Sequence, residues 1–341
     1  IVFMLFLLGL ELSIEKIIEL RRIVFTVGGL QMLICTALSF ILFYWGLNWN
    51  GMTSLVVASA LSMSSTALVL KVLSERGELL HHHGRNSVAI LIFQDMAAIP
   101  LLVLIAALAT FNIAEGLNSE TYLEMFSSVG YALLRATGLF ILMYLVGKYV
   151  LAGAVKHVID TQSEEFRLLF ILTIILGAAY LADIAGASMP LGAFLAGITI
   201  GETKFAHEFE IDIKPFRNVL LGLFFISLGT QFDISSLVSS WDLVLTFILV
   251  LSLVKASVIF MIFKVIGKPA NEAISTALIM AQGGEFGLLI ASLAFKNNLL
   301  GADISQPLIV SIILSMAIAP ILINRSTSIA SRFDKEVVKK C

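Results

Sequence analysis

A carboxylate inside an apolar stretch is the feature of this sequence that most clearly points to chemistry. Asp95, preceded by Gln94, lies in a segment expected to form a helix over about 88–110, long enough to cross a bilayer, which takes roughly 20 apolar residues. A charged Asp near the middle of such a helix costs roughly 2.5–3.5 kcal/mol on insertion scales. Proteins usually tolerate that cost where the group handles a proton or an ion. The alternative is a protonated Asp that joins two helices by hydrogen bonds.

Three consecutive hydroxyl side chains interrupt another apolar segment. Ser64-Ser65-Thr66 lies within a predicted helix over about 52–72. Hydroxyl groups can cap backbone groups that are freed where a helix unwinds, so the run predicts a broken membrane helix. The alternative is ordinary hydrogen bonding of Ser and Thr to the preceding turn.

A glycine-rich run occupies the middle of a later segment, predicted as a helix over about 272–295. Gln282, Gly283, Gly284 and Glu285 follow one another there, and glycines at that depth are unfavourable in an unbroken helix. A Glu that starts a new half-helix would face its positive end. The alternative is a glycine-lined packing face with a protonated Glu.

Lys255 lies far from either end of a predicted helix over about 243–265. A buried ammonium needs a partner that compensates its charge. We expect that partner to be Asp95 first and Glu285 second.

The elements that must position these residues follow from hydropathy. The two interrupted helices occupy corresponding places in the two halves of the chain and are expected to run in opposite directions. Such an inverted pair points to a midplane binding site in a secondary transporter. The first predicted helix ends near residue 12. The ten that follow span about 23–45, 52–72, 88–110, 128–151, 166–182, 189–201, 215–229, 243–265, 272–295 and 307–323.

The composition indicates a polytopic membrane protein. The 341 residues are 59% hydrophobic and 13% charged, whereas soluble domains carry about 25% charged residues. No basic patch suggests nucleic acid, the two cysteines make no disulfide framework, and we find no enzyme motif. His81, His82 and His83 are expected to be incidental loop residues rather than a metal site. Most of the 22 basic residues gather at one side of the predicted helices, which predicts a cytoplasmic C-terminus. The chain reads as a membrane core cut at both ends.

Short motifs along the whole chain resemble those of a known family. Gln282-Gly283-Gly284-Glu285-Phe286 is similar to that family's Gln-Gly-Ser-Glu-Phe run. The other similar motifs are Gly9–Leu12, Ser64–Ala67, Phe93-Gln94-Asp95 with Ala98–Leu101, Gly192–Gly197 and Leu221–Ile226. They resemble the Kef-type, glutathione-gated potassium/proton antiporters of the monovalent cation:proton antiporter-2 family.

The resemblance implies an all-α sodium/proton-antiporter-like fold with inverted repeats and two crossing broken helices. This chain would lack the first two helices and half of the third. It further implies an exchange domain over 1–325, with core helices at about 52–110, 166–201 and 243–323 and the remaining helices toward a homodimer interface. Residues 326–341 would start a linker to a cytoplasmic regulatory domain that binds nucleotide and glutathione-type regulators. No cofactor is expected in this chain.

For the site, the resemblance and the motifs together make Asp95 the group that binds either a proton or a potassium ion. Gln94, Ser65 and Thr66 would complete the oxygen ligands, with Ser64, Gln282, Gly283 and Gly284 forming the breaks. The resemblance also implies that Gln94 stands where electrogenic relatives carry a second carboxylate. In a polar loop similar to the family's regulatory loop, Glu210 and Asp212 would hold the regulatory domain; the loop departs from the pattern at Lys214, and the alternative is a solvated linker.

The predicted function is exchange of a monovalent cation, with potassium favoured, for a proton by alternating access in a bacterial inner membrane. The alternatives are a ligand-gated potassium channel-like pathway, a sodium/proton antiporter, and a membrane sensor without transport.

Overall fold

The computed structural model describes five stretches of the chain in full. They are 2–11, 21–108, 163–184, 189–201 and 239–338, joined by scattered positions at 130–145 and 203–230. Regular structure in these stretches is helical, without a strand among the described residues. The predicted helices at 128–151 and 215–229 fall mostly outside them. The chain divides into two compact units, Ile1–Glu19 with Thr110–Gln231 and Leu20–Ala109 with Phe232–Cys341.

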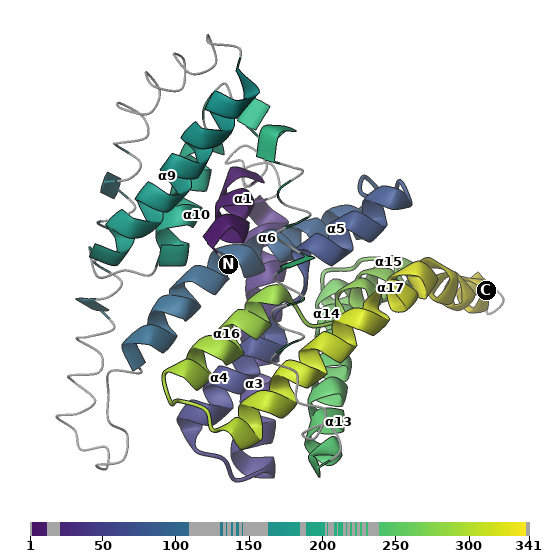
Figure 1. Ribbon diagram of the computed structural model, residues 1–341. Helices are drawn as coiled ribbons and strands as arrows, with labels where there is room; N and C mark the ends of the chain where they lie inside the picture. The colour runs from purple at the N-terminus through teal and green to yellow at the C-terminus, as the bar shows by residue number, and fades with distance from the viewer. Residues whose placement is uncertain are drawn as a thin grey trace. The chain divides into compact units, whose positions relative to one another are not determined.

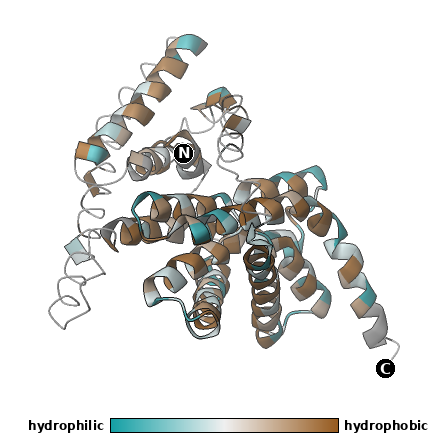
Figure 2. Cartoon of the chain, turned by 60° about the horizontal axis from the view of Figure 1, so that its bottom comes forward, coloured by the Kyte–Doolittle hydropathy of each residue, from teal (hydrophilic) through white to brown (hydrophobic). Residues whose placement is uncertain are grey.

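Seven helices in the described stretches are long and apolar enough to cross a membrane, in agreement with the predicted fold class. Two of them are interrupted at the predicted places. The seven are Arg21–Gly46, Gly51–Glu75, His82–Ile105, Glu165–Ile184, Trp241–Val265, Ala270–Lys296 and Ala302–Phe333. Hydrophobic residues predominate along these helices (Figure 2), and many large apolar side chains on them are exposed, as expected of helices that face lipid.

The second unit holds two sets of three spans, and the middle span of each set is broken (Figure 1). The first set is the π-helical turn η1 (Val24–Gly28), α3 (Gly29–Ile41), η2 (Leu42–Gly46), α4 (Gly51–Ser62), α5 (Thr66–Glu75) and α6 (His82–Leu108). The second set is α13 (Trp241–Leu249), η5 (Val250–Val254), α14 (Lys255–Val265), α15 (Ala270–Met280), α16 (Glu285–Lys296) and α17 (Ala302–Val338). Because α4 packs along α16 rather than α15, the broken helices run in opposite directions, as the inverted-repeat prediction requires.

The two breaks cross in direct backbone contact. Met63 is extended after α4 (φ −80°, ψ 146°), and Ser65 caps α5 by accepting a hydrogen bond from Leu68 N at 3.2 Å. In the other helix, Gly284 is extended before α16. A Cβ on Gly284 would overlap the Ser64 carbonyl, so only glycine lets the two chains approach this closely.

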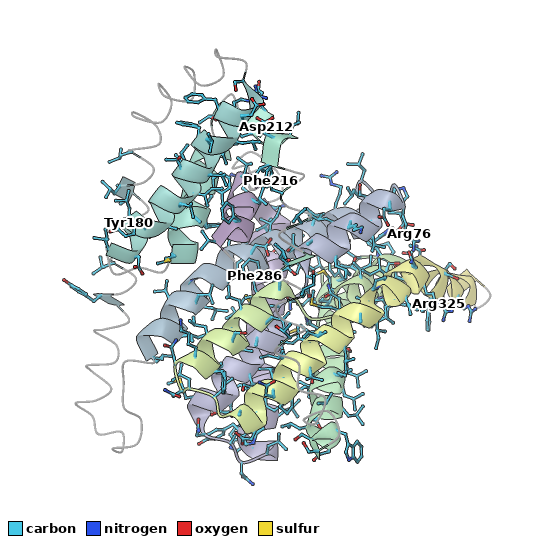
Figure 3. The ribbon with its side chains drawn as sticks, in the orientation of Figure 1. Arg76, Tyr180, Asp212, Phe216, Phe286 and Arg325 are labelled. Carbon is cyan, nitrogen blue, oxygen red and sulfur yellow. The ribbon has the colours of Figure 1, made fainter. Side chains whose placement is uncertain are left out.

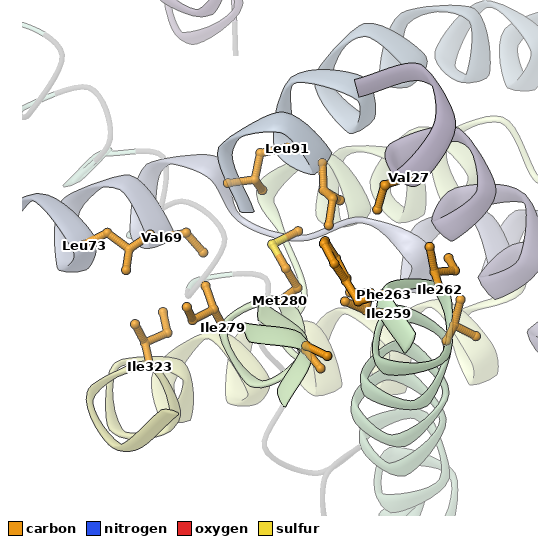
Figure 4. Packing of buried hydrophobic residues seen from close by; sticks show 14 of the residues in the cluster. Val27, Val69, Leu73, Leu91, Ile259, Ile262, Phe263, Ile279, Met280 and Ile323 are labelled. Atoms are coloured by element: carbon orange, nitrogen blue, oxygen red, sulfur yellow. The ribbon is translucent and has the colours of Figure 1, made fainter. Parts of the chain in front are cut away.

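An apolar cluster beside the crossing fixes the half-helices (Figure 4). Its members come from η1, α3, α5, α6, α14, α15 and α17 and are buried. Packing on several sides holds short helices that would be marginal alone. The labelled members are Val27, Val69, Leu73, Leu91, Ile259, Ile262, Phe263, Ile279, Met280 and Ile323.

The first unit contains α1 (Val2–Glu11), α9 (Glu164–Ile184) and α10 (Met189–Gly201). Gly9 of α1 faces Gly197 of α10, and a Cβ on either would overlap backbone of the other helix. Within this unit α10 packs against both α1 and α9, and the predicted grouping of residues 166–201 with the core helices stays a prediction.

Two predicted helix ends differ from the structure. The last helix was expected to stop at 323 before a linker from 326, but α17 continues to Val338. Because no Gly or Pro follows Pro320 within it, nothing in the sequence stops the helix there. His82 and His83, expected in a loop, begin α6.

Candidate functional site

Asp95 lies on α6 in the second unit with 2% of its surface exposed. The Thr66 hydroxyl oxygen is 2.9 Å from Oδ1 and 3.0 Å from Oδ2, so it donates to the carboxylate. Thr66 is the first residue of α5. The acid therefore lies at the positive end of a half-helix, which favours negative charge or a bound anion. The predicted proximity of Asp95 and Thr66 is present in the structure.

Glu285 brings a second carboxyl group to the same half-helix. It is the first residue of α16 and is 3% exposed. Its Oε1 accepts a hydrogen bond from the backbone N–H of Ala67, in the first turn of α5, at 3.4 Å. Two acidic side chains from different spans thus converge on the N-terminus of α5.

Lys255 is fully buried, but the predicted ion pair with Asp95 or Glu285 is wrong. Its ammonium donates to Met63 O at 2.5 Å, Gln282 O at 2.5 Å and Ser64 Oγ at 3.0 Å. Among the described residues, no carboxylate lies within ion-pair distance of it.

The physical reason is that two half-helices end at this point. Met63 follows α4 and Gln282 follows α15, so their carbonyls lie at the negative ends of two helix dipoles. Three acceptors satisfy the three donors of the ammonium. Two helix ends therefore take the place that the sequence assigned to a carboxylate.

Ser64 ties the two broken helices together. Its hydroxyl accepts from Lys255 and donates to Met280 O, at the end of α15, at 3.0 Å. Gly283 N donates to Ser315 Oγ of α17 at 2.9 Å. Side-chain oxygens thus satisfy backbone and ammonium groups that would otherwise be buried without partners.

The two glutamines also serve the breaks. Gln94 Oε1 accepts from Ser64 N at 2.8 Å, and Gln282 Oε1 accepts from Ser65 N at 3.2 Å. Both amide oxygens therefore satisfy backbone N–H groups of the first break. Gln94 Nε2 donates to Gln31 Oε1 at 2.8 Å. The sequence analysis did not single out Gln31, although it places an amide inside the apolar 23–45 segment.

The positive charge of Lys255 and the carboxyl groups of Asp95 and Glu285 lie at different helix ends beside the same break. The ammonium lies at the C-terminal ends of α4 and α15, whereas the carboxyl groups of Asp95 and Glu285 gather at the N-terminus of α5. Hard cations prefer oxygen ligands, and carboxylate and hydroxyl oxygens are present beside α5. Chemically, this place can hold a proton or a small cation.

The polar segment that was expected to be a loop is helical at Ile211–Ile213, and Asp212 is anchored within the first unit. Arg167 of α9 binds Asp212 through two parallel contacts, Nε–Oδ2 at 2.6 Å and a second nitrogen to Oδ1 at 3.1 Å; Figure 3 labels Asp212. Glu210 lies outside the described residues. The predicted regulatory role of both acids stays a prediction.

Interrupted antiparallel helices that cross at buried polar groups are typical of secondary transporters. The family model described as "Sodium/hydrogen exchanger, transmembrane" matches residues 1–326. The chain belongs to this family.

Relatives and a solved structure agree with that assignment. The chain is 34% identical to K(+) efflux antiporter 1, chloroplastic, of Arabidopsis thaliana, covering 99% of this chain and 28% of that protein. It is 35% identical to the putative K(+) efflux antiporter KefB of Alkalimonas amylolytica, over 98% and 49%. It is 32% identical to the glutathione-regulated potassium-efflux system protein KefC of Escherichia coli, over 95% and 50%.

The chain therefore spans half or less of the length of these relatives. Among solved structures, the sodium proton antiporter MjNhaP1 of Methanocaldococcus jannaschii matches with a TM-score of 0.68 and 17% identity, over 96% of this chain and 83% of that one. That likeness supports the fold.

Proposed function

We propose that this chain exchanges a monovalent cation, potassium, for a proton, with Asp95 as the group that binds one or the other. The observation that carries the proposal is a carboxylate 2% exposed at the N-terminus of α5, next to the crossing of two broken helices. The names of the potassium-efflux relatives support potassium over sodium.

Competition at one carboxylate couples the two ions. With Asp95 ionised, the Thr66 hydroxyl donates to it, and an approaching cation takes carboxylate and hydroxyl oxygens as ligands, with Glu285 close by. With Asp95 protonated, the negative charge that attracts the cation is gone. Each pH unit of gradient then contributes about 1.4 kcal/mol to exchange.

In this mechanism Lys255 stays with its three oxygens instead of moving to Asp95. Its position fixes one positive charge at the ends of α4 and α15. One acid that alternates between proton and cation moves no net charge per cycle. Alternating access would expose Asp95 to each side of the membrane in turn.

We further propose an integral protein of the bacterial inner membrane with a cytoplasmic C-terminus, acting as a homodimer under a regulatory domain that binds nucleotide and glutathione-type molecules. The name of the KefC relative, glutathione-regulated, supports this regulator class. No catalytic or cofactor role is proposed for this chain, and Glu210 and Asp212 are proposed to face the regulatory domain.

The test is Asp95→Asn in proteoliposomes that carry a pH-sensitive dye. An imposed potassium gradient should drive proton movement through the unchanged protein and only liposome leak through Asp95→Asn. Because Asn can still accept from Thr66, the fold should persist. Asp303→Asn, an exposed Asp at the start of α17, is the matched control and should exchange normally.

The same assay separates the alternatives. Wild-type exchange by Asp95→Asn would overturn the mechanism. Half-maximal exchange at a lower concentration of sodium than of potassium or rubidium would assign a sodium/proton exchanger. Cation flux that does not depend on the proton gradient would indicate a channel-like pathway. The absence of any cation flux would indicate a membrane sensor without transport.

A further inference from the structure

Two buried glutamines form a closed hydrogen-bond path around the break between α4 and α5. Ser64 N donates to Gln94 Oε1 at 2.8 Å, and Gln94 Nε2 donates to Gln31 Oε1 at 2.8 Å. Gln31 Nε2 then donates to Ser62 O at 3.3 Å, which also accepts from Gln94 Nε2 at 3.3 Å. Gln31 and Gln94 are both 0% exposed.

The direction of this path is fixed by its backbone ends. The Ser64 N–H can only donate, and the Ser62 carbonyl can only accept. Each amide between them must therefore present its oxygen toward Ser64 and its nitrogen toward Ser62. Turning over either amide would place donor against donor or acceptor against acceptor, which costs heavily in a buried site.

Few titratable groups among the described residues surround Gln31. Cys35, one turn along α3, is in hydrogen-bond contact with it. Asp95 on α6 follows Gln94, and Lys255 on α14 is already held by three oxygens. From α4, the Ser62 carbonyl accepts a hydrogen bond from it. Apart from the weakly donating Cys35 thiol, no hydrogen-bond partner of Gln31 among the described residues supplies the spare donor that an ionised side chain at position 94 would need.

We propose that Gln31 is a positioning residue that keeps position 94 a neutral hydrogen-bond link, so that Asp95 alone changes its charge. This inference rests on the exchange function proposed above. The number of carboxyl groups that change protonation in one transport cycle is then set by the hydrogen bonds between α3 and the broken helix, and not by the residue type at position 94 alone. An acid placed at 31 or 94 would fit the path only while protonated, because one of its oxygens must donate.

The first test needs no transport. In purified protein, the unfolding midpoint of Gln31→Glu should match wild type near pH 5 and fall below it by about 5 °C or more near pH 9, as the new acid ionises. Gln31→Met, of similar size but without donor or acceptor, should show an offset that does not depend on pH. Equal pH dependence of the two variants would overturn the proposal.

The second test reads the exchange itself. Gln31→Met should raise the potassium concentration for half-maximal exchange about tenfold at every pH, whereas Gln31→Glu should do so only at high pH. Gln94→Glu should remain electroneutral, so exchange with the membrane potential clamped should carry no current. A steady current from Gln94→Glu with Gln31 intact would overturn the proposal.

The two tests distinguish failure of the proposed exchange function from failure of the proposed role of Gln31. If wild-type protein shows no exchange, the proposed function is lost, and the unfolding midpoints still decide whether Gln31 imposes a neutral partner. If wild type exchanges but the Gln31→Glu midpoint is independent of pH, the function stands and the role of Gln31 is refuted.

Discussion

Two of the close backbone contacts between helices in the described part of the chain exist for different reasons. In the first unit, α1 and α10 meet at Gly9 and Gly197, where any Cβ would overlap the other helix. In the second unit, Gly284 lies against the backbone of Ser64 in the same way. The first pair consists of unbroken helices whose backbone hydrogen bonds are internal, so packing alone holds it.

The second contact joins broken helices, and breaking a helix frees backbone N–H and C=O groups that must find partners away from water. Lys255, Ser64, Gln94 and Gln282 supply those partners. The comparison teaches that close glycine packing carries no chemistry by itself. Polar groups gather where the backbone is open, and Asp95 lies beside that opening.

The largest effect should come from removing the ammonium of Lys255. Lys255→Met leaves the carbonyls of Met63 and Gln282 at two helix ends without a donor, which should lower the free energy of unfolding by about 3–5 kcal/mol. Thermal unfolding in detergent measures this. Lys264→Met, at an exposed position of the same helix, is the control. A Lys255→Met protein as stable as the control would mean that the helix ends need no charge.

The second comparison substitutes one glycine in each contact. Gly284→Ala should abolish exchange, because its Cβ would displace Ser64 and the neighbouring start of α5 that holds Asp95. Gly197→Ala should cost about 1–3 kcal/mol of stability through overpacking but leave the potassium concentration for half-maximal exchange within about twofold. Unfolding midpoints and the proteoliposome assay report both quantities.

Controls for these glycines exist in the chain. A Cβ on Gly177 of α9 meets nothing within 4 Å, so Gly177→Ala should be neutral or stabilising by roughly 0.5–1 kcal/mol. In the other break, a Cβ on Gly283 meets the side chains of Ile312 and Ser315 at 2.8 and 3.0 Å, which can move. If Gly283→Ala harmed exchange as much as Gly284→Ala, the backbone contact would not be the deciding feature.

The sequence was sufficient to predict the broken helices and their antiparallel order, because runs of glycine and hydroxyl residues inside apolar segments disfavour an unbroken helix. It also predicted that Thr66 and Asp95 meet. It did not predict the partners of Lys255, since helix-end carbonyls become acceptors only once the break has its three-dimensional shape. Charge pairing between side chains was the wrong rule for that residue.

Gln31 was missed for a related reason. A single amide in an apolar span has no spacing that assigns it to another helix, and its contact with Gln94 joins positions 63 residues apart. The extension of α17 to Val338 was not predicted, because the family resemblance placed the start of a linker at 326–341, although charged residues form helices readily. Local composition thus indicated which residues lie within the membrane-spanning helices, but not which residues they contact.

The smallest effect should come from a partly exposed polar cluster at the ends of three membrane spans, around Arg76 and Glu78, which lie outside the spans. Arg76, at the end of α5, donates to Glu78 Oε1 at 2.6 Å and to the carbonyls of Ile323 and Asn324 in α17. Figure 3 labels Arg76. Glu78 also contacts His83 Nε2 at 3.1 Å. The cluster joins a half-helix to α17 without closing it off from solvent.

Partial burial raises the pKa of Glu78, but the hydrogen bonds from Arg76 and His83 outweigh it and hold the pKa below its ordinary value. A carboxyl with a lowered folded-state pKa stabilises the protein at pH above its unfolded-state pKa, and loses that contribution as pH falls through the folded-state value. Glu78→Gln should therefore lower stability by about 1 kcal/mol or less at pH 7, and the difference from wild type should vanish in acid. Unfolding midpoints measured in steps from pH 7 down to about pH 2, where carboxyl groups are protonated, with exposed Glu75→Gln as the control, test this. A difference that persists unchanged down to the lowest pH would show that Glu78 acts through packing rather than through its charge.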